Sequence, residues 1–302
     1  MAAPLFLTDG GIETSLVADH GLDLPCFAAF PLLESEAGTA ALRAYFQPYL
    51  DLAREQGTGF VLDTPTWRAN PDWAGELGYS PEALDAVNRR AVAFAIRLRD
   101  EAGADAPIVV DGVIGPRGDG YVAGERMSVA EAQAYHAPQI ASLASAGADM
   151  VSAITMTYPE EAIGIARAAE AAGVPVVVSF TVGTDGRLPS GESLRDAIER
   201  VEAESGGAPA HYMINCAHPT HFEGALEPGP WLDRIGGLRA NASARSHAEL
   251  DEAAEIDRGD PADLGARYAR LRSVLRGVTV LGGCCGTDHR HVAEIVAAWN
   301  RP

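Results

Sequence analysis

Residues 278–287 read VTVLGGCCGT, a short apolar run that leads directly into glycines and two adjacent cysteines. The apolar part, 278–281, lacks the alternation of apolar and polar residues that a half-exposed strand shows, so we expect a strand that is buried on both faces. Strands of this kind are typical of a parallel sheet covered by helices. The cysteines would then lie just beyond the end of a strand, where such folds carry their binding and catalytic residues.

Seven more apolar runs precede this one, and amphipathic stretches or long loops separate them. The expected strands are 4–7, 60–62, 108–110, 150–154, 174–180, 212–214, 235–238 and 278–281. Ala-Gly pairs at 102–103, 146–147 and 172–173 stand where a helix would end before the next strand. Eight strand units in 302 residues predict an α/β fold of the (β/α)8 TIM barrel type, with a doubly wound open sheet as the alternative.

Composition favours an ordinary globular enzyme, with 47% hydrophobic and 22% charged residues. No linker or low-complexity tract divides the chain, so we expect one domain over residues 1–302. The formal charge of −19 repels phosphate backbones and anionic headgroups, which argues against nucleic acid as a partner. The first 15 residues do not resemble a signal peptide, and no apolar run approaches the roughly 18 residues that span a bilayer. We therefore expect a cytoplasmic protein with no membrane partner.

Three of the four cysteines predict a metal site. The glycines around Cys284 and Cys285 permit backbone angles that turn both thiolates toward one metal, and Cys216 directly follows the sixth expected strand. If the sixth and eighth strands are near neighbours in a closed barrel, the three sulfurs meet at its C-terminal mouth. Three protein ligands with a fourth position open are typical of catalytic zinc, so we predict Zn²⁺ at this point. The alternative is buried free cysteines, which we expect for Cys26.

Three motifs make the chain resemble the homocysteine S-methyltransferase family over essentially its whole length. They are Asp9-Gly10-Gly11 after the first strand, Asn215-Cys216 after the sixth, and residues 282–287 after the eighth. The family includes betaine-dependent and S-methylmethionine-dependent enzymes, and such members are zinc-bearing (β/α)8 barrels. The resemblance implies a methyltransferase that moves a methyl group from a small onium donor to a zinc-bound thiol. Homocysteine is the first candidate acceptor, and its product would be methionine, as in methionine biosynthesis.

The resemblance also implies substrate contacts. In the family, the corner formed here by Asp9, Gly10 and Gly11 binds the amino-acid end of homocysteine, since its amides suit an anion and Asp9 suits an ammonium. Residues 63–71 resemble the loop that faces the methyl donor, and the indole of Trp67 would attract an onium centre by cation–π interaction. Loop packing is the alternative for Trp67. Further candidate contacts are Thr155 for the substrate, Asn215 for the substrate or resting metal, and the hydroxyl of Tyr158.

One position departs from the family pattern. Members that use homocysteine typically place an amine-binding glutamate at the end of the fourth strand, and here this position falls on Ile154. Loss of a charge-assisted hydrogen bond in a dry site costs about 1.5 to 3 kcal/mol. Glu160 and Glu161 are candidate substitutes, but both fit the first turn of the following helix.

The departure at Ile154 leaves several functions open. The acceptor is homocysteine or another small thiol or selenol. One alternative enzyme is a methyltransferase or demethylase that acts on a different thiol and onium pair. A second alternative is a non-catalytic protein for zinc storage or redox sensing. The sequence names neither the donor nor the oligomeric state, and a homo-oligomer is compatible with it.

Overall fold

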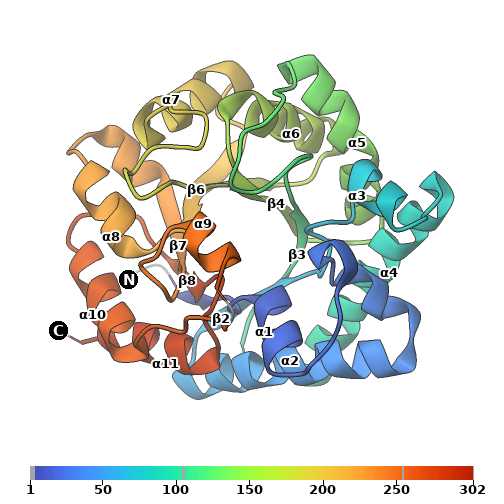
Figure 1. The fold of residues 1–302 in the computed structure, drawn as a ribbon, viewed down its shortest axis with the longest axis horizontal. Helices are drawn as coiled ribbons and strands as arrows, with labels where there is room; N and C mark the ends of the chain where they lie inside the picture. The colour runs from blue at the N-terminus through green and yellow to red at the C-terminus, as the bar shows by residue number, and fades with distance from the viewer. Residues whose placement is uncertain (1–3, 104–105, 254, 302) are drawn as a thin grey trace.

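In the computed structural model, eight parallel strands close into a barrel in which each strand pairs with its neighbours in sequence order, and β1 pairs with β8 (Figure 1). The structure describes residues 4–103, 106–253 and 255–301. The strands are β1 Phe6–Leu7, β2 Gly59–Asp63, β3 Ile108–Ile114, β4 Met150–Met156, β5 Val176–Phe180, β6 Pro209–Asn215, β7 Ile235–Ala240 and β8 Val280–Gly283. Each predicted apolar run overlaps one of these strands, and the (β/α)8 prediction is confirmed.

Helices surround the barrel on all sides (Figure 1). They are α1 Ile12–Ala18, α2 Glu36–Gln56, α3 Pro71–Glu76, α4 Pro81–Ala102, α5 Val129–Ser145, α6 Pro159–Ala172, α7 Leu194–Ser205, α8 Pro219–Phe222, α9 His247–Asp251, α10 Pro261–Leu271 and α11 His289–Trp299. Several start at a serine whose hydroxyl accepts a backbone N–H of the first turn, as Ser35 and Ser193 do. None of these helices, taken over the described residues, has the length and apolarity that a membrane crossing requires.

The apolar core has two layers. The larger cluster lies between the strands and the helices, because strand residues that point outward meet the buried helix faces. The smaller cluster fills the inside of the barrel and consists of Val61, Val113, Ile154, Val177, Met213 and Val280. Alternate residues of each strand face inward, which explains why the strands are apolar throughout. Ile154 therefore lies both in the barrel interior and near its C-terminal rim.

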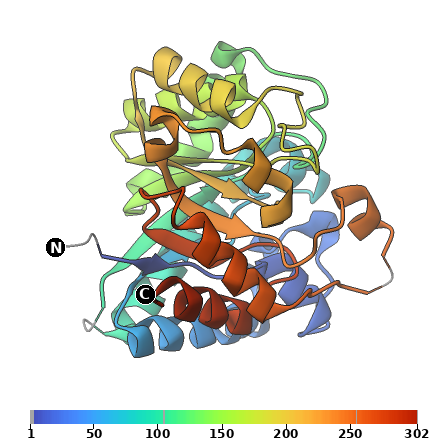
Figure 2. The same cartoon turned by 90° about the vertical axis from the view of Figure 1, so that its left-hand side faces the viewer.

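Two short segments project at the C-terminal mouth of the barrel. α1 follows β1, and α9 lies in the long connection after β7. Figure 2 shows both on the same side of the molecule, with α9 extending beyond the barrel. Residues from both helices line one outer cavity, among them Val17 from α1 and Leu250 from α9. The loops at this mouth therefore enclose the space directly above the strand ends.

Candidate metal and ligand site

The three predicted metal ligands converge at the mouth of the barrel. The sulfur atoms of Cys216, Cys284 and Cys285 all lie within 4.8 Å of one another, and the Cys216 and Cys285 sulfurs are 3.8 Å apart. A tetrahedral zinc ion with Zn–S bonds of about 2.3 Å separates its sulfur ligands by about 3.8 Å. Over the part of the chain that the structure describes, no other trio of Cys, His or acidic side chains meets the same criterion.

The backbone of β7 holds the cysteines in place. β7 lies between β6 and β8, and its last two carbonyl groups accept hydrogen bonds from the cysteine amides: Arg239 O from Cys216 N at 3.1 Å, and Ala240 O from Cys284 N at 2.9 Å. Cys216 itself adopts a φ of 51°, in the left-handed region that few side chains other than glycine favour. Strain of this kind costs on the order of 1 to 3 kcal/mol and is typical of functional sites.

Close packing explains the glycines of the motif. A Cβ atom on Gly282 would lie 1.9 Å from the Thr8 hydroxyl oxygen, and one on Gly11 would lie 2.7 Å from the Cys284 carbonyl oxygen. Side chains at these positions would force the end of β8 away from the corner after β1. The glycines thus let the backbone that carries the cysteines approach the backbone that carries α1.

The thiols form a coupled group with one tyrosine. Contacts from Cys284 and Cys285 lower the pKa of Cys216, and the same contacts raise the pKa of Cys284 and Cys285. The hydroxyl oxygen of Tyr121 lies 3.6 Å from the Cys216 sulfur and 3.5 Å from the Cys285 sulfur. Burial raises the pKa of Tyr121, and the neighbouring thiols raise it further. Tyr121 thus keeps its hydroxyl proton beside the sulfurs.

Tyr121 was not predicted from the sequence. It lies in the loop between β3 and α5, and its ring stacks on His247 of α9 with the centroids 3.7 Å apart. Tyr158, the hydroxyl candidate that follows the fourth strand, has another contact: its hydroxyl accepts a hydrogen bond from the Met127 amide at 3.1 Å, and it does not line the cavity beside the cysteines. No local motif marks Tyr121, and the approach of its loop to α9 brings it to the three cysteines.

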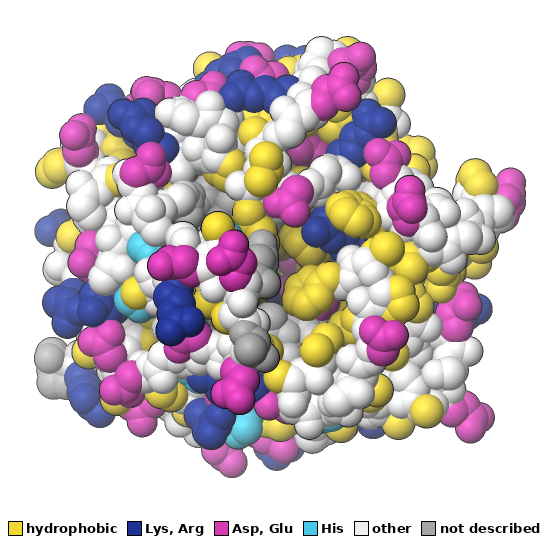
Figure 3. Space-filling view, viewed as in Figure 1, with side chains coloured by type: hydrophobic (Ala, Val, Ile, Leu, Met, Phe, Trp, Pro, Cys, Tyr) yellow, Lys and Arg dark blue, Asp and Glu magenta, His cyan; other side chains and the backbone are white. Residues whose placement is uncertain are grey.

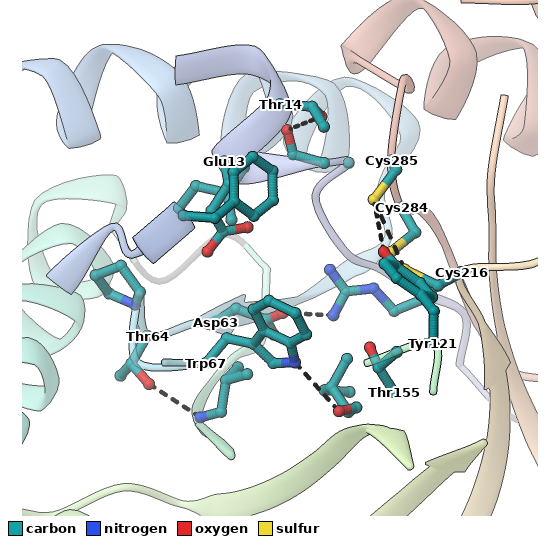
Figure 4. Close-up of a pocket in the computed structure, with 18 residues that line it drawn as sticks. Glu13, Thr14, Asp63, Thr64, Trp67, Tyr121, Thr155, Cys216, Cys284 and Cys285 are labelled. Atoms are coloured by element: carbon teal, nitrogen blue, oxygen red, sulfur yellow. Dashed lines mark hydrogen bonds and ion pairs between the residues drawn. The ribbon is translucent and has the colours of Figure 1, made fainter. Parts of the chain in front are cut away.

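A cavity opens beside the cysteines; the empty space in and above it, including the part open to solvent, is about 610 Å³. Figure 3 shows the hollow in this face of the molecule, with hydrophobic side chains around it. The three cysteines border it on one side and form what we call the cysteine wall. Glu13 and Trp67 lie across the space from them (Figure 4). We use the name Trp67 wall for Glu13, Phe27, Trp67 and Ile154, all of which line the cavity.

Trp67 occupies the predicted position, and the protein itself supplies one of its contacts. The indole Nε1 donates to the Ile154 carbonyl at 3.2 Å, which fixes the ring against the end of β4. The Arg68 guanidinium lies 4.1 Å from the Trp67 ring centroid and 4.0 Å from that of Trp73. An onium ligand would therefore meet an indole that already has one cationic neighbour, and Trp67 as a donor contact stays a prediction.

Asp9 has a different partner from the expected substrate ammonium. Its carboxylate forms an ion pair with Arg239 and accepts a hydrogen bond from the Tyr45 hydroxyl at 2.9 Å. Burial raises the pKa of Asp9 to about 7, against the lowering effect of Arg239. Gly10 and Gly11 line the cavity but Asp9 does not. Arg239 also pairs with Asp63, so this group of charges is largely satisfied within the protein.

Asn215 supports the site from behind. Its side-chain oxygen accepts from the Thr155 amide at 3.0 Å and the Ser179 hydroxyl at 2.6 Å, and its Nδ2 donates to the Thr155 hydroxyl at 2.8 Å. Asn215 is fully buried and does not line the cavity. The side-chain oxygen that we expected to contact the substrate or metal is thus already hydrogen-bonded within the protein. Thr155 does line the cavity, with a φ of 66° that is strained for a β-branched residue. The bonds from Asn215 hold this strained turn.

The cavity contains a carboxylate that was not predicted from the sequence. Ile154 lines the cavity as expected, while Glu160 pairs with Arg200 at 2.8 Å and Glu161 contacts His136 at 2.9 Å, both outside the cavity lining. Of the two carboxylates in the lining, Asp63 pairs with Arg239 and Glu13 does not, and burial raises the pKa of Glu13 to about 8. In sequence it reads as an ordinary acid in the first turn of a helix.

Cys26 also differs from its expected environment. It is half-buried rather than packed in the core, and it stands apart from the cysteine wall. Cys26 and the following residue, Phe27, both have positive φ values, of 56° and 54°. Phe27, the second residue of this strained turn, lines the cavity.

Comparison with known proteins identifies relatives over nearly the whole chain. The family model described as homocysteine S-methyltransferase matches residues 6–299. The chain is 24% identical over 314 residues to homocysteine S-methyltransferase 2 of Arabidopsis thaliana, an alignment that covers 95% of this chain and 90% of the relative. Among solved structures, the oxidized form of the homocysteine methyltransferase MmuM from Escherichia coli has a TM-score of 0.76 at 22% identity and covers 97% of this chain and 95% of its own. The metallated form has a TM-score of 0.74 at 22% identity, with 98% and 96% covered.

Proposed function

Since the chain belongs to the homocysteine S-methyltransferase family, we propose that it is a zinc-dependent enzyme that transfers a methyl group from a small onium compound to the sulfur of a small thiol. The observation that carries the proposal is the convergence of the three sulfurs of Cys216, Cys284 and Cys285 beside an open cavity. A solved relative, the E. coli methyltransferase MmuM, has a metallated form, which supports metal use here.

The donor set fits zinc. Three thiolates are suitable ligands for this ion, and the sulfur separations match a tetrahedral site. All three cysteines line the cavity, so a fourth position would face the substrate rather than the protein interior. When bound, zinc would lower the pKa of an acceptor thiol and keep it as a nucleophilic thiolate at neutral pH.

The protein's own residues supply binding and orientation. The Tyr121 hydroxyl lies within hydrogen-bond distance of the Cys216 and Cys285 sulfurs, and its stack on His247 covers the site from the side of α9. Trp67 offers an aromatic surface across the cavity for a sulfonium or quaternary ammonium. In the overall reaction the acceptor sulfur bonds to the methyl carbon and the bond from that carbon to the onium atom breaks. The donor keeps that electron pair and leaves as a neutral sulfide or amine.

Homocysteine is our first proposal for the acceptor, with methionine as the product. The names of the relatives support it, and S-methylmethionine and betaine are the first donors to test. The presence of Ile154 in the cavity lining keeps a small thiol or selenol without an amine as the specific alternative. That alternative includes demethylation of another onium compound by the same chemistry.

A matrix of thiols and onium donors tests the proposal. The zinc-loaded protein is incubated with homocysteine or 4-mercaptobutanoate and with S-methylmethionine or glycine betaine, and methylated thiol is detected by mass spectrometry. We expect product from at least one pair, none with Cys216→Ala, and an undiminished yield with Cys26→Ala. Stoichiometric zinc without product from any pair, together with zinc loss on mild oxidation, would favour a zinc-storage or redox-sensing protein.

A further inference from the structure

Glu13 faces the cavity without a counter-charge. Over the described part of the chain, no Lys, Arg or His nitrogen lies within 4.0 Å of its carboxylate, whereas the other carboxylate in the lining, Asp63, is paired with Arg239. Arg68, whose charge lowers the Glu13 pKa slightly against the effect of burial, is held between Trp67 and Trp73 and donates to the Gly118 carbonyl at 2.9 Å. The protein thus leaves this carboxyl group for a ligand: burial raises its pKa to about 8, and a bound cation would favour its ionised form.

The surroundings of Glu13 suit an organic cation. Figure 4 shows its carboxylate directed into the space beside Trp67, and Phe27 lines the same part of the protein surface. A carboxylate combined with aromatic faces attracts a compact cation by charge and by cation–π interaction together. An inorganic metal ion fits less well, because no second carboxylate or histidine joins Glu13 in a metal-binding group among the described residues.

A purely structural role does not explain this orientation. Acids in the first turn of a helix stabilise it by their charge, and Glu36 of α2 and Glu82 of α4 do so from exposed positions. Glu13, the second residue of α1 as Glu82 is of α4, is instead half-buried and lines the cavity. Ile154 leaves the β4 side of the cavity without a charge, so Glu13 is the carboxylate that remains available.

We infer that Glu13 is a specificity-determining residue that binds a small organic cation, an ammonium or onium group carried by one of the two substrates. The inference rests on the proposed function for the identity of those substrates. It places the negative charge for substrate recognition on the corner after β1 rather than at the end of β4. An onium methyl donor and an amino-acid acceptor each carry a cationic group, and the experiment distinguishes the two.

Isothermal calorimetry on the zinc-loaded protein tests the inference with probe pairs in which the second member replaces the cationic centre by carbon or lacks the ammonium group. Glycine betaine is compared with 3,3-dimethylbutanoate, dimethylsulfoniopropionate with 4-methylpentanoate, and homocysteine with 4-mercaptobutanoate. We expect wild type to prefer the cationic member of at least one pair, and Glu13→Gln to reduce that preference by roughly ten- to a hundredfold. The pair that responds identifies the donor or the acceptor as the source of the cation.

Two further variants make the result interpretable. Glu82→Gln removes an acid from the same helical position, the second residue of α4, outside the cavity, and we expect it to bind like wild type. Glu13→Asp keeps the charge on a shorter side chain and should retain most of the preference, even if Glu13→Gln folds poorly. Equal preference in wild type and Glu13→Gln, or loss of preference in Glu13→Asp as complete as in Glu13→Gln, overturns the inference. Because the readout is binding, absence of methyl transfer would count against the proposed function alone.

Discussion

The cysteine wall and the Trp67 wall of the cavity are assembled in different ways. The cysteine wall comes from two strand ends, and the carbonyl groups of β7 hold both of them. The Trp67 wall comes from four segments: the start of α1, the turn at Pro25–Phe27, the loop after β2 and the end of β4. Backbone geometry thus fixes the first wall, while side chains on separate connections form the second.

This difference shows which features of the site tolerate change. A metal ion needs three sulfurs within a fraction of an ångström of one geometry, so the cysteine wall depends on close-packed glycines such as Gly282. Recognition of a substrate charge requires only that a carboxylate reach the right part of the cavity. Glu13 and Ile154 illustrate this: α1 supplies a carboxyl group to the cavity, whereas β4 places an apolar side chain there.

Removal of one sulfur from the cysteine wall should have the largest effect. We expect about one zinc per chain in the wild type, and in Cys216→Ala a loss of most zinc and at least about a hundredfold of methyl-transfer activity, because two thiolates hold zinc poorly. Metal analysis by mass spectrometry and circular dichroism would measure zinc content and fold. Cys26→Ala is the matched control, since Cys26 lies outside the cluster. Full zinc and turnover in Cys216→Ala would show that the cysteine wall is not the metal site.

Truncation of the Trp67 side chain should have a smaller effect, confined to binding of the methyl donor. Trp67→Ala should weaken binding of an onium donor by up to about 2 kcal/mol, and Trp67→Phe should recover part of this loss. The donor Michaelis constant reports the change. Trp73→Ala is the control because Trp73 also stacks on Arg68 but does not line the cavity. An equal loss in Trp73→Ala would mean that Trp67 acts by positioning Arg68 and not by contacting the donor.

A charge placed at the end of β4 tests whether the family pattern can be restored. Ile154→Glu should shift the ratio of specificity constants for homocysteine and 4-mercaptobutanoate toward homocysteine, by roughly tenfold for about 1.4 kcal/mol of charge pairing. The melting temperature should fall, since Ile154 packs in the apolar barrel interior. Ile154→Gln separates the charge from the change in shape. A wild-type enzyme that already prefers homocysteine a hundredfold would show that another group binds the amine.

The smallest expected effect concerns the stability of the ligand-free protein. Burial raises the pKa of Glu13 to about 8, above its ordinary value of 4.5, so between these values the folded state keeps a proton that the unfolded state releases. Glu13 therefore makes the wild type lose stability as pH rises from 4.5 to 8. Glu13→Gln should remove this loss and gain on the order of 1 kcal/mol at pH 8 relative to wild type. Urea unfolding at pH 5 and pH 8 measures it, and parallel pH profiles would contradict the assignment.

The sequence by itself determined the barrel and the convergence of the three cysteines. Unbroken apolar runs predict strands buried on both faces, and a parallel strand order then places all strand ends at one mouth. Cys216, Cys284 and Cys285 stand at such ends, so their convergence follows from the strand count alone. These inferences succeed because they use periodicity and position along the backbone, which are local properties of the chain.

Only the tertiary structure decided which charges and hydroxyl groups face the cavity. Asp9 and Glu13 are four residues apart and both are acids near β1, yet Asp9 pairs with Arg239 and Glu13 faces the ligand space. Tyr121 and Tyr158 both follow strands, but only Tyr121 reaches the sulfurs, because its ring stacks on His247 of a distant helix. The direction and partner of a side chain at a loop depend on contacts between segments far apart in sequence, and no local pattern encodes those contacts.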